Sequence, residues 1–169
     1  MRDTQRIGEG VIVGTPGWEA ELAANQAAFA VEFVQRAEFV ARYPTTLTPA
    51  EFVDALYANA GVTPSAEERQ AAIDEFGGAA TSADTAARAR VLRRVADNAT
   101  FRQREFNPAF VLMEYFGYLR RNPNDPPDTD FGGYDFWLNK LNSSPDFRQA
   151  EMVEAFISSI EYRARFGRT

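Results

Sequence analysis

The sequence predicts an all-α fold, roughly seven helices built around an internal duplication. Three observations lead to this prediction. Helix-start signals recur along the chain, and apolar residues follow one another at steps of three, four or seven. A third observation is that no extended run of alternating β-branched residues predicts a strand. The chain has 169 residues, of which 45% are hydrophobic and 13% aromatic, so it can fill a core.

The first elements differ in character. Residues 1–17 are polar and glycine-rich around a short apolar stretch, Val11–Val13, and predict a linker, an N-terminal extension or an edge strand. We expect a single all-α domain over residues 18–169. Its first part, about residues 18–43, predicts one long helix or a broken pair.

Two capping boxes predict the next helices. Thr48 followed by Pro49 and Glu51 starts a helix that runs to about Asn59, where Gly61 suits the left-handed turn. The second box, Ser65 to Glu68, starts a helix that Gly77–Gly78 ends. A third helix, capped by Thr81 or Ser82, should reach about Asn98, and Asn107–Pro108 should start a fourth.

Residues 122–131 hold three prolines among acidic residues and must form a loop. Helices are expected again over 133–141 and from Asp146 to about Ser158. A short final helix, capped within Ser158–Glu161, should dock its aromatic residues on the core.

Three segments of the chain resemble one another. Phe39, Phe101 and Tyr162 align at intervals of about 60 residues, and so do Arg42, Arg104 and Arg165. A helix of similar pattern follows the first two segments. We interpret this as a duplicated helical unit, with a degenerate copy at about 25–100 and a better-matching copy at about 101–167. Chance similarity between arginine-rich amphipathic helices is the alternative.

Composition excludes several kinds of site. The chain has no histidine and no cysteine, which excludes Ser-His-Asp and Cys-His catalysis, zinc sites built on imidazole or thiolate, iron–sulfur clusters and disulfides. The net charge of −6 argues against nucleic acid as a partner. The densest basic stretch is expected on the solvated side of a helix; it comprises Arg88, Arg90, Arg93 and Arg94. No apolar run is long enough for membrane insertion.

Residues 115–141 and 156–167 resemble the bacterial domain-of-unknown-function family numbered 4214. That family's pattern combines an aromatic residue, Leu, Arg and Pro with a Gly, an aromatic-Trp pair, Leu and a Ser-x-Glu-aromatic helix. The matching residues are Tyr115, Leu119, Arg121, Pro123, Gly133, Phe136, Trp137, Leu141, Ser159, Glu161 and Tyr162. Two departures stand out: Asp125–Phe131 resembles an insertion, and the first copy lacks the Arg and the Trp after Tyr57.

The resemblance implies an all-α fold similar to phycobilisome-linker helices, and a module of long secreted or surface bacterial proteins. No catalytic activity is attached to the family. We therefore expect a non-catalytic structural or adhesive module, with other domains of the parent protein or a cell-surface polymer as partners and no required cofactor. The glycine-rich start of this sequence agrees with a piece of a longer chain.

Acidic residues of the 122–131 loop raise the possibility of bound calcium. Asp125, Asp128 and Asp130 are close in sequence, and Ca²⁺ prefers oxygen ligands. The spacing does not fit an EF-hand, because Asn139 stands where the bidentate Glu belongs. A solvated turn stabilised by Asp and Asn side chains explains the same residues.

Aromatic residues beside this loop suggest a binding surface. Phe131, Tyr134 and Trp137 are candidates for contacting sugars or peptides, with Arg121 beside them. Core packing is the alternative, and we favour it for Trp137 and Phe136. A carbohydrate- or peptide-binding module that uses residues 122–134 is thus the second functional hypothesis.

Arg121 and Glu161 are expected to pair, or Arg121 to bond to the backbone, which would tie the loop to the last helix. Two separate solvated charges are the alternative. A third hypothesis is a small carboxylate hydrolase, for which Glu114, Glu161 and Asp125 are conceivable groups. Structural roles are predicted for Trp137, Glu161, Tyr162, Phe39 and Phe101.

Overall fold

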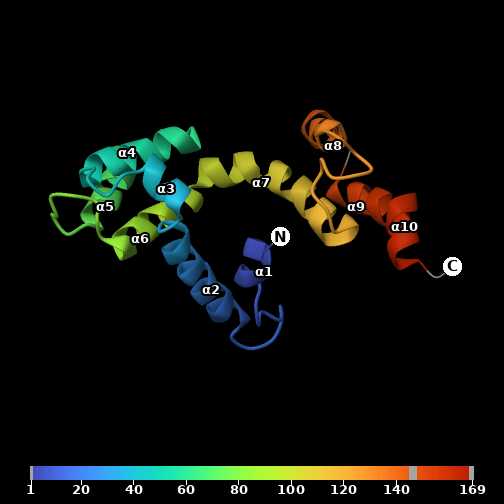
Figure 1. Cartoon of the computed structure of the whole chain (residues 1–169), viewed down its shortest axis with the longest axis horizontal. Coiled ribbons are helices and arrows are strands. Elements are labelled where there is room, and N and C mark those ends of the chain that lie inside the picture. The colour runs from blue at the N-terminus through green and yellow to red at the C-terminus, as the bar shows by residue number, and fades with distance from the viewer. Residues whose placement is uncertain (1, 145–147, 168–169) are drawn as a thin grey trace. The chain divides into compact units, whose positions relative to one another are not determined.

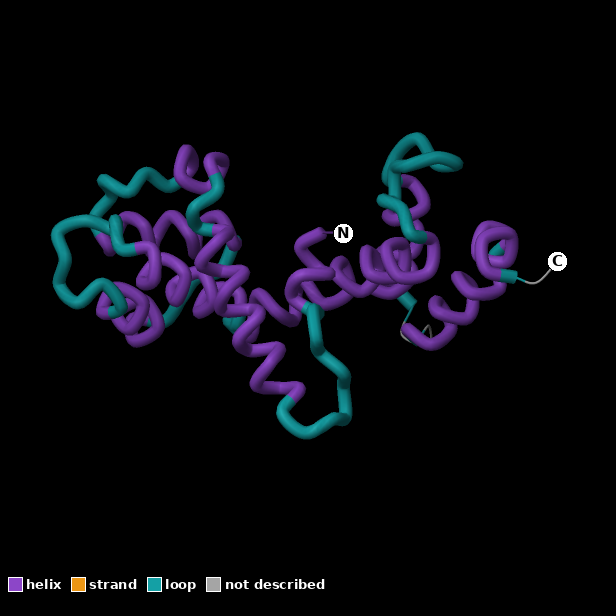
Figure 2. Tube along the Cα trace, turned by 60° about the horizontal axis from the view of Figure 1, so that its bottom comes forward, coloured by secondary structure: helices purple, strands orange, loops and turns teal. Residues whose placement is uncertain are grey.

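The computed structural model describes residues 2–144 and 148–167, and every regular element among them is helical (Figures 1 and 2). This confirms the all-α prediction. The described residues form ten α-helices and one π-helical segment, more than the roughly seven that the sequence suggests. The chain divides into two compact units, Met1–Arg102 and Gln103–Thr169.

Unit 1 holds the first six helices and the start of the seventh. They are α1 (Arg2–Ile7), α2 (Trp18–Phe33), α3 (Ala37–Arg42), α4 (Pro49–Ala60), α5 (Ala66–Asp74), α6 (Thr85–Ala96) and the first residues of α7 (Ala99–Glu114). The region expected as a long helix or a broken pair is the broken pair α2–α3.

The N-terminal segment folds back onto α2. The Asn25 side chain donates to the carbonyl groups of Ile7 (3.2 Å) and Glu9 (2.7 Å), and Arg36 donates to both oxygens of Asp3 at 2.8 Å. The edge strand considered for residues 1–17 is therefore wrong. The segment forms helix α1, held by polar contacts with α2 and the turn after it.

Both predicted capping boxes are present. The Thr48 hydroxyl accepts from the Glu51 amide while the Glu51 carboxylate accepts from the Thr48 amide, and Ser65 and Glu68 do the same at α5. Gly61 ends α4 with φ +62°, as expected.

The start of α6 differs from the prediction. Its N-cap is Asp84, whose carboxylate accepts from the Ala87 amide at 2.9 Å, and not Thr81 or Ser82. Ser82 is fully buried, and its hydroxyl accepts from Arg88. The Ser82 side chain, which the sequence predicted as a cap of α6, therefore makes a tertiary contact instead.

The core of unit 1 is aromatic. The rings of Phe39, Tyr43, Phe52 and Phe76 form a chain of tilted or edge-to-face contacts, with centroids 4.8–6.3 Å apart. Apolar side chains from α2, α4, α5 and α6 surround them, and Phe101 packs against the same cluster. The cluster links helices that are distant in sequence and gives unit 1 a single interior.

Unit 2 contains the rest of α7, the π-helical segment η1 (Tyr115–Leu119), α8 (Gly132–Ser143), α9 (Gln149–Ser158) and α10 (Ile160–Phe166). The fourth helix predicted to start at Asn107–Pro108 does not form. Helix α7 is continuous from Ala99, with Pro108 inside it. Proline removes one backbone donor, and this helix continues without it.

Unit 2 has a smaller hydrophobic core of its own. Its buried members are Val111, Tyr115, Leu119, Met152 and Phe156. Trp137 packs against this cluster, with its ring centroid 5.6 Å from that of Phe156, and Tyr162 packs on Tyr118 at 5.9 Å. The structural roles predicted for Trp137 and Tyr162 agree with these contacts. The predicted helix start at Asp146 lies outside the described residues; α9 begins at Gln149.

Candidate functional site

Arg121 organises the loop of unit 2. Its side chain is 8% exposed, its Nε and Nη2 donate to the two oxygens of Glu161 (2.8 and 3.0 Å), and Nη2 also donates to Asp128 (2.7 Å). Its Nη1 faces three backbone carbonyls, those of Asn122 (3.1 Å), Pro123 (3.2 Å) and Asp125 (3.0 Å). The pair with Glu161 and the bonding to backbone, which the sequence posed as alternatives, are both present.

These contacts stabilise the protonated, positively charged form of Arg121. The hydrogen bond to Glu161, followed by that to Asp128, raises the pKa of the guanidinium further above its ordinary value. Beneath it lies the ring of Tyr115, with the guanidinium carbon 5.2 Å from the ring centroid. Burial raises the pKa of the Tyr115 hydroxyl. The guanidinium nitrogens of Arg121 thus all donate hydrogen bonds within unit 2. These bonds connect the 122–131 loop to Glu161 of α10.

The packing of Tyr115 also explains the glycine at position 133. A Cβ at this position would lie 2.7 Å from the Tyr115 hydroxyl oxygen, closer than a side chain can approach. A larger residue at position 133 would therefore require the buried Tyr115 side chain to shift.

The three aspartates considered for calcium are engaged separately. Asp125 accepts from the Asn122 amide (2.8 Å), Asp128 pairs with Arg121, and Asp130 accepts from the Gly132 amide (2.7 Å). Within the described residues, no group of three or more acidic side chains is placed to hold a metal ion. Asp125 and Asp130 thus each bond to a backbone amide of the loop, and Asp128 is part of the Arg121 network.

The aromatic residues of this region separate into two kinds. Trp137 is half-buried against the core, and the half-buried Tyr134 donates from its hydroxyl to the Pro108 carbonyl at 3.4 Å. Phe131 is 49% exposed and Phe136 57% exposed. The core position favoured for Phe136 is wrong, because its side chain is exposed; its ring meets Trp137 edge to face and lies 5.8 Å from the Lys140 ammonium. Phe131 meets Tyr134 edge to face, with centroids 6.2 Å apart.

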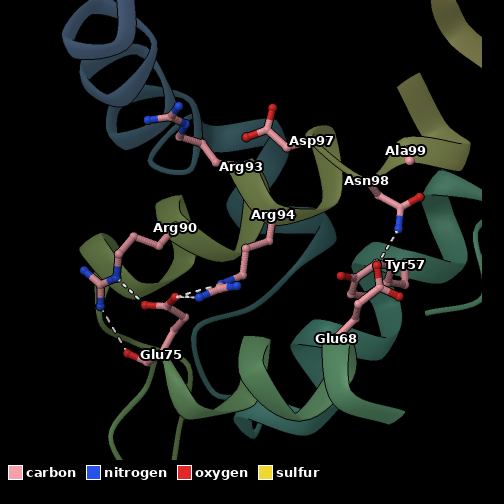
Figure 3. Close-up of a pocket in the computed structure, with 9 residues that line it drawn as sticks. All are labelled: Tyr57, Glu68, Glu75, Arg90, Arg93, Arg94, Asp97, Asn98 and Ala99. Carbon is pink, nitrogen blue, oxygen red and sulfur yellow. Dashed lines mark hydrogen bonds and ion pairs between the residues drawn. The ribbon is translucent and has the colours of Figure 1, made fainter. Parts of the chain in front are cut away.

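A polar pocket of about 510 Å³ opens in unit 1 between α4, α5 and α6 (Figure 3). Glu75 lies on one side, between the guanidinium groups of Arg90 (2.5 Å) and Arg94 (2.6 Å). On the other side the Asn98 side chain donates to Glu68 at 3.0 Å, with Tyr57 next to it. Acidic and basic side chains thus both line the pocket, and Arg90 and Arg94 are paired there with Glu75.

The electrostatics of this pocket follow from those pairs. The hydrogen bond from Arg90, and then that from Arg94, holds the pKa of Glu75 below its ordinary value of 4.5. Burial raises the pKa of the Tyr57 hydroxyl, and the nearby Glu68 charge adds to it. A general acid needs a carboxyl whose pKa is raised, so Glu75 does not suit that role.

The sequence predicted that Arg88, Arg90, Arg93 and Arg94 lie on the solvated side of a helix, and it gave no sign of this pocket. Arg90 and Arg94 are exposed on α6 and Arg93 also lines the pocket, while Arg88 is 1% exposed. The prediction that Arg88 is solvated is wrong. On a helix, residues 88 and 90 point in different directions, so the four-residue spacing of Arg90 and Arg94 was the usable signal.

One acidic side chain is buried alone. Glu114 in α7 is 5% exposed, and its Oε2 has no hydrogen-bond partner. Burial raises the pKa of this carboxyl. Of the other two carboxylates considered for a hydrolase, Glu161 is held by Arg121 and Asp125 stabilises a turn, so the structure pairs neither with Glu114 by a hydrogen bond.

In comparisons with known proteins, no family model, no curated protein and no solved structure matches this chain. Among the described residues, no helix is both long enough and apolar enough to cross a membrane.

Proposed function

We propose that this chain is a non-catalytic structural or adhesive module of a larger secreted or surface bacterial protein. Its partners would be other domains of that protein or a cell-surface polymer. The observation that carries the proposal is the state of the charged groups at both candidate sites. Glu75 is shared by two arginines, and Arg121 holds two carboxylates and three carbonyls. Such networks stabilise loops and helix contacts, which supports a structural role.

We also propose that the two units derive from one duplicated unit. Helices α3, α7 and α10 begin at Ala37, Ala99 and Ile160, each two residues before the aligned aromatic residue. Two of the preceding helices, α6 and α9, hold buried pairs at aligned positions, Val91 and Val95 in one and Met152 and Phe156 in the other. In α2 the residue aligned with Val95 and Phe156 is Phe33, which is partly buried against the unit 1 core.

The helices that follow also correspond. Val53 and Tyr57 are buried in unit 1, and so are Val111 and Tyr115 at the aligned positions of unit 2. Matching burial at matching positions is what a common origin requires, since core positions are fixed by packing. The contacts of Arg121, Gly133, Trp137 and Glu161 give physical reasons for the residue types of the 4214 family pattern. We therefore propose membership of that family for unit 2.

A sedimentation assay tests the adhesive role. The purified chain is mixed with insoluble bacterial cell-wall polysaccharide, and both bound protein and released reducing ends are measured. We expect saturable binding without release of reducing ends. Release of fragments that ceases in Glu114→Gln would contradict the proposal in favour of the hydrolase, and absence of saturable binding would contradict the adhesive role.

The second hypothesis, a carbohydrate- or peptide-binding module, is favoured by one observation. Phe131 is 49% exposed and Phe136 is 57% exposed, both in or close to the 122–131 loop. Exposed rings of this kind stack on sugar faces or peptide side chains. In the same assay, Phe131→Ala and Phe136→Ala should then weaken binding about tenfold, while Phe106→Ala, a matched control that is 60% exposed on α7, should not. Equal binding by all three variants would contradict this hypothesis.

A further inference from the structure

The 122–131 loop contains the one Asp–Pro bond of the chain, between Asp125 and Pro126. In such a bond the Asp carboxyl is joined to its own backbone carbonyl carbon through only Cβ and Cα. Its attack on that carbon closes a five-membered ring, so the nucleophile is held next to its target by covalent bonds. The leaving group is the nitrogen of a tertiary amide, which takes up a proton more readily than an ordinary peptide nitrogen.

Two donors meet at the carbonyl oxygen of this bond. Arg121 Nη1 donates to the Asp125 carbonyl at 3.0 Å, and the backbone amide of Asp128 donates to the same oxygen at 3.1 Å. Arg121 is buried, and a guanidinium stays charged. Negative charge develops on a carbonyl oxygen when a nucleophile attacks its carbon, and two donors at these distances are the arrangement of an oxyanion hole.

The two carboxylates that bind Arg121 do not compete for this donor. Glu161 accepts from Nε and Nη2, and Asp128 accepts from Nη2, so Nη1 donates to backbone carbonyls alone. The carboxylates hold the planar guanidinium in position. A donor that is in place before the reaction begins costs no reorganisation when charge develops.

The Asp125 carboxyl is bonded at one oxygen and available at the other. Its Oδ2 accepts from the backbone amide of Asn122 (2.8 Å) and from the Asn122 side chain (2.9 Å), while no described group donates to Oδ1. The bonds to Asn122 restrict rotation of the carboxyl and leave Oδ1 as the attacking atom. Pro126 is exposed, so water reaches the leaving nitrogen.

We propose that the chain cleaves itself between Asp125 and Pro126, with Arg121 and the Asp128 amide stabilising the charge on the Asp125 carbonyl oxygen. The protonated Asp125 carboxyl attacks its own carbonyl carbon through Oδ1, and its proton passes through water to the Pro126 nitrogen. The C–N bond breaks, which leaves a cyclic anhydride on Asp125 and a free amine on Pro126.

Water then opens the anhydride and gives two fragments, residues 1–125 and 126–169. Each chain is cut once and does not turn over. The structural or adhesive role proposed above does not depend on this reaction, and the reaction does not depend on that role.

Incubation of the full chain at about pH 5 tests the proposal, with mass spectrometry of samples denatured at intervals. The two fragments should form at least about tenfold faster in the folded chain than in the same chain unfolded in urea at the same pH, because only the fold assembles the two donors. Hydroxylamine, which reacts with anhydrides, should leave a hydroxamate on Asp125 of the first fragment. A folded chain that stays intact, or is cut no faster than the unfolded chain, would overturn the proposal.

Three variants assign the roles. Asp125→Ala should not be cut, because the nucleophile is gone, while its matched control Asp130→Ala, which also removes a loop carboxylate bonded to a backbone amide, should be cut at the parent rate. Arg121→Gln should be cut about as slowly as the unfolded parent, whether or not it folds, since either outcome removes this donor. Cleavage of Asp125→Ala at this bond, or cleavage of Arg121→Gln at the parent rate, would contradict the mechanism.

Discussion

Arg88 and Arg121 show how one residue type is buried in two ways. Arg121 is paired with two carboxylates, whereas Arg88 relies on carbonyls, a hydroxyl and aromatic faces. Burial lowers the pKa of Arg88, while its partners raise that of Arg121. Arginine tolerates both settings because its charge is delocalised over a planar, weakly hydrated group.

Glu114 is the residue for which we predict the clearest pH effect. We expect Glu114→Leu to stabilise the protein at pH 7 by about 1–2 kcal/mol, since Leu56 occupies the aligned buried position of unit 1. Burial raises the pKa of Glu114 above its unfolded value of 4.5. The wild-type protein therefore loses stability as the pH rises above 4.5, where the unfolded state releases this proton, and the loss is complete above the folded pKa, where the buried carboxyl is charged.

This destabilisation disappears as the pH falls below the unfolded pKa, because both states are then protonated. Urea unfolding of both proteins between pH 7 and pH 4 checks the prediction. The difference between them should shrink as the pH is lowered; a difference that is constant or grows on acidification would contradict it.

At the scale of elements, Arg121 fastens the 122–131 loop to α10. We expect Arg121→Lys to destabilise unit 2 by about 3 kcal/mol, because one ammonium group cannot serve carboxylates and carbonyls that surround a planar fork. Its neighbour Arg120 is exposed, so Arg120→Lys is a matched control that should change stability by less than about 0.5 kcal/mol.

Fluorescence of Trp137 during urea unfolding measures this effect, since that side chain packs on the unit 2 core. Equal unfolding midpoints for Arg121→Lys and Arg120→Lys would show that the Arg121 network does not stabilise unit 2.

The whole molecule consists of two units with unequal interiors. Among the described residues, the unit 1 cluster has many more buried apolar members than the five of unit 2, and the large exposed apolar side chains are mostly in unit 2. Because burial of apolar surface dominates stability, we predict that unit 2 unfolds first.

Calorimetry should therefore resolve two transitions. Met152→Ala should lower the first, with a cost of about 2–5 kcal/mol, and Val53→Ala should lower the second. The chain has 2 Trp, Trp18 in unit 1 and Trp137 in unit 2. Thermal unfolding of each single Trp→Phe variant, followed by the fluorescence of the tryptophan that remains, therefore assigns each transition to a unit. One transition that both core variants shift equally would contradict this prediction.

Local chemistry in the sequence determined most of the helices. Thr48, Ser65 and Gly61 act through atoms within a few residues of themselves, so their roles are visible without a fold. The Arg121–Glu161 pair was one of the alternatives that the sequence left open, and the structure contains it together with bonds from Arg121 to backbone carbonyls. Only the tertiary structure decided that Ser82 supports Arg88 instead of capping α6, that Phe136 is exposed, and that Glu75 joins two arginines. Those outcomes depend on which helices meet, and a pattern within one segment does not contain that information.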